Sequence, residues 1–174
     1  MLAAIAIIVW QISELDNKRE APPREAPGLS FHTNAGGEVT LPDALQCHTV
    51  VVFWRADSER SLKLVAEAIE VIAEPPGDFE VDFYLVSLDD DLATIRSVVD
   101  YDNPDIPFGY RAQGTLLDEF DLNAVPVTIH FSRSGKIIGK HEGYQPNRLI
   151  RDLRRYALIR NLGSRSDGFH FPGE

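Results

Sequence analysis

Cysteine and positive charge are both scarce in this 174-residue chain. It has one cysteine, Cys47, and it carries 17 Lys and Arg residues against 27 Asp and Glu residues, for a formal net charge of −10. A single thiol cannot form a disulfide within the chain. The acidic balance argues against nucleic acid as a partner, because a polyanion is bound through clustered positive charge.

Long hydrophobic runs are also missing. Residues 2–10 form a nine-residue apolar stretch, whereas a helix that crosses a bilayer needs about 20 apolar residues. We interpret residues 1–19 as an N-terminal apolar tether, a truncated anchor, with an ordinary amphipathic helix start as the alternative. Residues 20–27 contain three prolines and predict an extended linker.

Groups of metal ligands are not visible in the sequence. Cys47 and His48 are neighbours, but consecutive residues of a strand face opposite ways. Asp89 to Asp91 precede a helical pattern, which favours helix capping over metal binding. No ligand spacing appears among the other histidines, which are His32, His130, His141 and His170. The sequence therefore predicts no metal site and no cofactor.

The composition is that of a globular domain. Hydrophobic residues make up 44% of the chain and charged residues 25%, and the length suits one domain with short extensions. We place this domain at residues 28–160 and expect residues 161–174 to be a flexible C-terminal tail.

The pattern around residues 49–61 predicts a buried strand that leads directly into a helix. Val50 to Trp54 is an apolar run of β-branched and aromatic residues, typical of a strand covered on both faces. A polar turn follows, and then apolar residues recur at spacings of three and four. Such a junction points the free N–H groups of the helix at the turn.

The remaining elements alternate in type along the chain. We predict strands at 29–33, 39–41 and 80–88, a hairpin formed by 127–131 and 136–140, and helices starting at Leu92, at 114–120 and at 146–160. The segment 100–113, with two prolines, is expected to be a long irregular connection.

Three short motifs in this order resemble the thioredoxin-like proteins. The run from Phe53 to Ser61 resembles the family's F-W-A-x-W-C-x-x-C segment, and 124–128 followed by 134–138 resembles its cis-proline motif and the hairpin after it. Residues 26–31 followed by 37–41 resemble its entry segment, A-P-x-F and G-x-x-x-x-L. The match is best with the TlpA-like, membrane-tethered thiol-disulfide oxidoreductases. It implies a three-layer α/β/α fold with a mixed central sheet of about five strands.

The CxxC motif is replaced by Ser58-Glu59-Arg60-Ser61. In the family the first cysteine is a thiolate of lowered pKa that attacks a disulfide. A serine hydroxyl titrates far above a thiol, and a helix dipole worth about 0.3–1 kcal/mol lowers a pKa by less than one unit. We therefore predict that the Ser58 hydroxyl caps the helix and is not a nucleophile.

The resemblance also implies where a partner would bind. The family's substrate surface corresponds here to a groove with an expected cis bond between Val125 and Pro126. Its predicted partner-binding residues are Trp54, Ser58, Ser61, Val125 and Pro126. The implied ligand is a protein or peptide in extended form, bound outside the cytoplasm by a domain tethered on the periplasmic side of the membrane.

Three functions compete at this point. The first is a redox-inactive thioredoxin-like module of the cell envelope that binds a protein partner or assists maturation. The second is a thiol-disulfide oxidoreductase by descent, working through Cys47. The third is a hydrolase that uses Ser58, for which the sequence identifies no histidine as the base.

Overall fold

The computed structural model describes residues 24–75, 80–122 and 124–166, with side chains as far as Leu158. The proposed tether, residues 20–23 of the linker and residues 167–174 of the tail lie outside the described residues. Among the helices that are described, none combines the length and apolar character needed to cross a membrane.

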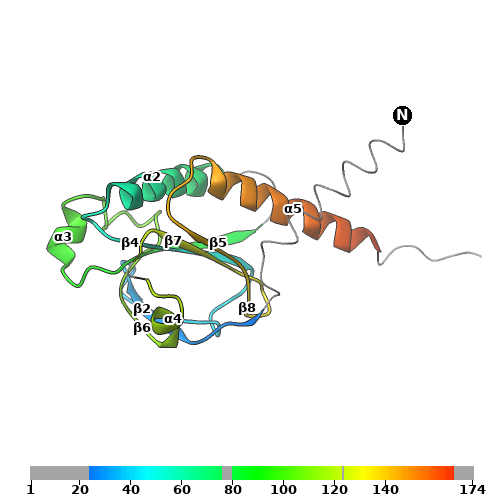
Figure 1. Ribbon diagram of the computed structural model, residues 1–174, viewed down its shortest axis with the longest axis horizontal. Coiled ribbons are helices and arrows are strands. Elements are labelled where there is room, and N and C mark those ends of the chain that lie inside the picture. Colours follow the sequence, from blue (N-terminus) through cyan, green and yellow to red (C-terminus); the bar gives the residue numbers. More distant parts are fainter. Residues whose placement is uncertain (1–23, 76–79, 123, 167–174) are drawn as a thin grey trace, which may run out of the picture.

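One eight-stranded mixed sheet organises the chain, in the order β1-β8-β7-β4-β5-β6-β2-β3. Figure 1 shows this curled sheet with helices against it. The strands are β1 (Arg24–Glu25), β2 (Leu29–Thr33), β3 (Glu38–Leu41), β4 (His48–Trp54), β5 (Val81–Ser87), β6 (Phe108–Gln113), β7 (Val127–Phe131) and β8 (Lys136–Glu142). The helices are α2 (Glu59–Ala73), α3 (Leu92–Arg96), α4 (Thr115–Glu119) and α5 (Arg148–Ser166).

The predicted central strand is confirmed. β4 lies between β7, which is antiparallel to it, and β5, which is parallel. Alternate residues of β4 enter two separate cores. Val50, Val52 and Trp54 pack with α2, α3 and α5, whereas Val51 and Phe53 pack with α4 and with β2. Both faces of the strand are covered, which explains its continuous apolar run.

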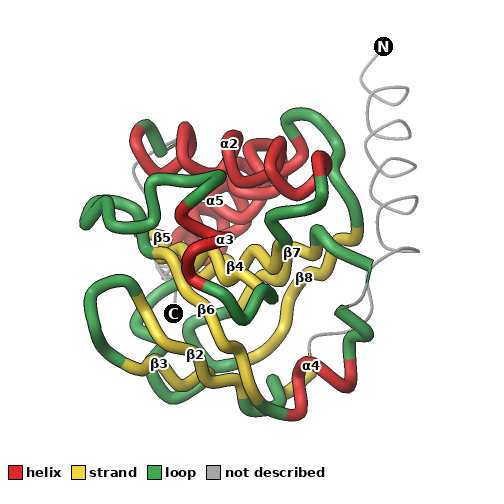
Figure 2. Tube along the Cα trace, turned by 90° about the vertical axis from the view of Figure 1, so that its left-hand side faces the viewer, coloured by secondary structure: helices red, strands yellow, loops and turns green. Residues whose placement is uncertain are grey.

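The layers match the predicted three-layer α/β/α class, with unequal helical layers. Helices α2 and α5 lie together on one face of the sheet, and the short α4 lies on the other (Figure 2). The sheet has eight strands instead of about five, because two unpredicted strands, β1 and β6, join it and the predicted β2–β3 hairpin is part of the same sheet. β1 belongs to the expected linker, β6 to the expected irregular connection, and the β2–β3 hairpin pairs with β6.

Two predicted boundaries change in the structure. Residues 108–113 form β6 because β5 and β2 satisfy its backbone groups, so the irregular connection is shorter than expected. The final helix continues to Ser166, beyond the predicted end at Arg160, and so includes the start of the expected tail. The other predicted helices and strands are present within a few residues of their expected bounds.

Candidate functional site

The N-terminus of α2 is built by a serine cap. Ser58 has an extended backbone (φ −102°, ψ 108°), and its Oγ accepts a hydrogen bond from Ser61 N at 3.2 Å. This bond satisfies one of the free N–H groups at the start of the helix. The predicted capping role of Ser58 is confirmed.

Asp89 holds the turn that precedes this cap. Its Oδ2 accepts hydrogen bonds from Ala56 N at 2.7 Å and from Ser87 Oγ at 2.9 Å. The predicted capping role of the acidic run applies to Asp91, which caps α3 through the N–H groups of Ala93 and Thr94. Asp89 instead bridges the ends of β4 and β5, and sequence reasoning missed this role because the contact spans 33 positions.

The Val125–Pro126 loop lies at the same end of the sheet. Its peptide bond is cis, and Pro126 O accepts a hydrogen bond from Gly143 N at 2.7 Å. Val127 pairs with Phe53 in antiparallel register, so the residue before Val127 lies beside the residue after Phe53. The loop therefore adjoins the end of β4, from which the turn to Ser58 departs.

The burial of the predicted partner-binding residues corrects that prediction in part. Trp54 and Ser61 are 0% exposed, and Pro126 is also buried. These three side chains belong to the interior and cannot contact a partner in this conformation. Ser58 and Val125 are partly exposed and remain the accessible members of the predicted set.

A surface depression of about 270 Å³ lies beside the turn. It is bounded by Arg55 from the turn, by residues at the end of β5, and by β6 and α4. Arg55 and Arg111 line it together with Asp90 and Asp118, so both signs of charge are present. Its position at the carboxyl ends of two parallel strands is where open α/β sheets commonly bind ligands.

Cys47 lies at the opposite end of β4. The seven residues of that strand separate it from the Ser58 turn by about 23 Å, at roughly 3.3 Å per residue. The side chain is 6% exposed. Burial, together with the nearby Asp82, raises the pKa of its thiol to about 11. Cys47 is therefore protonated near neutral pH, and this disfavours both nucleophilic attack and metal ligation.

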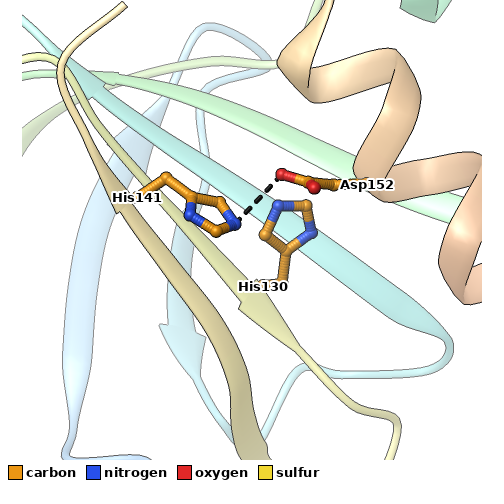
Figure 3. Close-up of side chains that lie close together, drawn as sticks. All are labelled: His130, His141 and Asp152. Atoms are coloured by element: carbon orange, nitrogen blue, oxygen red, sulfur yellow. Dashed lines mark ion pairs between the residues drawn. The ribbon is translucent and has the colours of Figure 1, made fainter. Parts of the chain in front are cut away.

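The structure gathers histidines that the sequence had separated. His130 of β7, His141 of β8 and Asp152 of α5 point toward one another (Figure 3), and His48 lies beside His130. Spacing along the sequence did not reveal this group, because its members come from two strands and a helix. The cluster also provides no catalytic base near Ser58. His130 pairs with Val50, which lies well before the end of β4, whereas Ser58 follows that end. The hydrolase hypothesis therefore gains no base from this cluster.

Burial of the two inner histidines favours their neutral forms. The pKa of His130 is lowered to about 3, chiefly by burial and then by the neighbouring His48. Burial lowers the pKa of His48 to about 4. Asp152 has a lowered pKa even though burial opposes ionisation, because His141 donates to it and the nearby Arg148 guanidinium favours the carboxylate. His48 and His130 thus form a neutral imidazole pair beside the Asp152 carboxylate.

Comparison with known proteins identifies the fold. No protein-family model and no curated protein matches the chain, whereas solved structures do. StoA from Bacillus subtilis matches with a TM-score of 0.60 and 16% identity, over 75% of this chain and 99% of StoA. A thiol-disulfide oxidoreductase from Bacteroides fragilis matches with a TM-score of 0.62 and 17% identity, over 76% and 99% of the two chains.

A third match is the exposed lipoprotein thioredoxin of Streptococcus pneumoniae. Its TM-score is 0.57 and its identity 18%, over 74% of this chain and 98% of the lipoprotein. At these identities the likeness concerns the fold. The chain has a thioredoxin-like fold, and its structural neighbours include thiol-disulfide oxidoreductases.

The two serines of the degenerate motif should respond differently to alanine. We expect Ser58→Ala to lower the free energy of unfolding by about 1 kcal/mol, because it removes the cap. Ser61→Ala should leave that free energy unchanged or raise it by up to about 1 kcal/mol, because the Ser61 hydroxyl is buried without a hydrogen-bond partner. Urea unfolding followed by circular dichroism measures both effects.

Ser58→Asp is the matched control, since aspartate caps a helix as well as serine does. It should retain the stability that Ser58→Ala loses. A larger loss for Ser61→Ala than for Ser58→Ala would contradict these assignments.

Proposed function

We propose that this protein is a thioredoxin-like module of the cell envelope that binds a protein segment and has no dithiol redox activity. The observation that carries the proposal is the hydrogen bond from Ser61 N to Ser58 Oγ. At the position where the family's motif has a reactive thiol, this chain has a hydroxyl engaged in holding its own helix. Such a group can neither attack a disulfide nor form one.

The shape of the region supports a binding role. Ser58 and Val125 are partly exposed on two adjoining loops, and a depression lined by Arg55 and by residues of β6 and α4 lies beside the same turn. Asp89 fixes the turn by accepting a 2.7 Å hydrogen bond from Ala56 N. Because the turn is already ordered, binding costs less conformational entropy. An extended segment of a partner is the ligand that such a loop suits, through hydrogen bonds to exposed backbone.

A photo-crosslinking residue at Val125 should capture this partner in intact cells, and one at Leu158 should not.

The cell envelope is the proposed location. The apolar run at residues 2–10 followed by a proline-bearing segment supports it, and so does the likeness in fold to an exposed lipoprotein. Recovery of the untagged protein wholly in the cytosolic fraction would contradict this part of the proposal.

A disulfide-reduction assay tests the redox part. We expect no multiple turnovers from the unmodified protein with insulin as substrate. The double substitution Ser58→Cys/Ser61→Cys should produce turnover, because it places a thiol at the positive end of the helix with a resolving partner three residues later.

Two controls complete this experiment. Ser58→Cys alone should give no sustained turnover, since it lacks the resolving thiol. Cys47→Ala should change nothing. Turnover by the unmodified protein that disappears in Cys47→Ala would favour the second function, an oxidoreductase that works through Cys47.

A further inference from the structure

The histidine cluster lies between the sheet and α5, away from the Ser58 turn. His130 Nε2, His141 Nε2 and a carboxylate oxygen of Asp152 converge on one small volume (Figure 3). All three donor atoms lie within 4.8 Å of one another, and His141 Nε2 is 3.0 Å from Asp152 Oδ2. The ligand atoms of a zinc ion lie about 2.0–2.2 Å from the metal. The three donor atoms therefore need to move only modestly closer together to bind one zinc ion.

His130 contributes an acceptor that the protein leaves unused. The residue is 0% exposed, and its Nε2 has no hydrogen-bond partner. Its other ring nitrogen, Nδ1, lies 3.3 Å from His48 Nε2. A proton on Nδ1 shared with His48 leaves a lone pair on Nε2, directed at the convergence point. Ligating histidines are commonly oriented in this way by a hydrogen bond to the second nitrogen.

The Asp152 carboxylate already has a cationic neighbour, the Arg148 guanidinium. Arg148 Nη2 lies 2.6 Å from His141 Nδ1, and Arg148 Nε lies 3.5 Å from Asp152 Oδ2. A guanidinium only donates, so His141 Nδ1 accepts and the proton of His141 sits on Nε2, facing Asp152. The Arg148 side chain is 35% exposed and also reaches Gln145 at the surface, so it has room to turn outward.

We propose that His130, His141 and Asp152 form a binding site for one divalent transition-metal ion of the zinc class, which displaces the Arg148 guanidinium. The proton of His141 moves from Nε2 to Nδ1 once Arg148 leaves, so Nε2 becomes a ligand without a net change in charge on the ring. Two imidazoles and a carboxylate suit zinc and its neighbours, whereas calcium and magnesium prefer oxygen ligands. Three protein ligands leave a further position for water.

The test uses the full chain, freed of metal with a chelator and then titrated with Co²⁺ and Zn²⁺. We expect one Co²⁺ per chain with visible absorption bands, displaced by Zn²⁺, and a higher melting temperature with Zn²⁺. His141→Gln and Asp152→Asn should each weaken Zn²⁺ binding at least tenfold. His48→Phe should weaken it about tenfold, as loss of an orienting partner does.

Two variants separate a specific site from general loss of structure. Arg148→Gln removes the competing cation and should strengthen Zn²⁺ binding several-fold, a change that unfolding cannot produce. His32→Ala, which alters an exposed histidine of β2, should bind Zn²⁺ as the unmodified protein does. The proposal is overturned if the unmodified chain binds no Zn²⁺, or if Asp152→Asn with a preserved metal-free melting temperature binds it equally well.

Discussion

Trp54→Ala should lower the free energy of unfolding by about 3–5 kcal/mol, the cost of emptying a large aromatic site in a core. Trp54 is 0% exposed and packs in the core beneath α2, with its ring centroid 6.5 Å from that of Phe108. The measurement is urea unfolding followed by circular dichroism. This result would establish that Trp54 supports the candidate groove from within the core. The sequence had instead indicated that Trp54 contacts the partner.

Trp54→Phe is the matched control for this prediction. It keeps an aromatic ring and removes an indole N–H that is buried without a hydrogen-bond partner, whose unmet desolvation costs about 1–3 kcal/mol. The phenylalanine variant should therefore lose much less stability than the alanine variant. A loss below about 1 kcal/mol for Trp54→Ala would contradict the assignment of Trp54 to the core.

Lowering the pH from 7 to 5 should reduce the free energy of unfolding by about 2–4 kcal/mol in the metal-free protein. Folding lowers the pKa of His130 to about 3 and that of His48 to about 4 from the ordinary value of 6.5. Between pH 6.5 and 4 the unfolded chain therefore binds more protons than the folded chain, so stability falls as the pH falls. One pKa unit corresponds to about 1.4 kcal/mol for each group.

His48→Gln should reduce this loss by about half, because it removes one of the two buried titrating rings. Asp152 does not obscure the effect. Its pKa is lowered from 3.8, so its contribution is lost only at pH values below the range of the experiment. Equal stability at pH 7 and pH 5, measured by denaturant unfolding with a chelator present, would contradict the neutral, buried state of the two histidines.

Local sequence patterns predicted the elements that depend on nearby residues. The run from Val50 to Trp54 is apolar on both of its faces, and this indicated a covered strand at the centre of the sheet. The Ser58 cap was predictable because its hydroxyl bonds a backbone group three residues away. The strand 108–113 was missed, since it contains glycine and arginine and is stabilised by pairing with β5 and β2.

The sequence by itself determined the buried central strand, the serine-capped helix after it and the absence of a cysteine pair at that helix, because each depends on residue identity over a few positions. Only the tertiary structure decided which side chains of that region reach solvent, since Trp54 is covered by distant segments and Ser61 is fully buried. The tertiary structure also determined that the histidine cluster forms. His130, His141 and Asp152 come from two strands and a helix, and strand register and helix packing, which no local spacing encodes, bring them together.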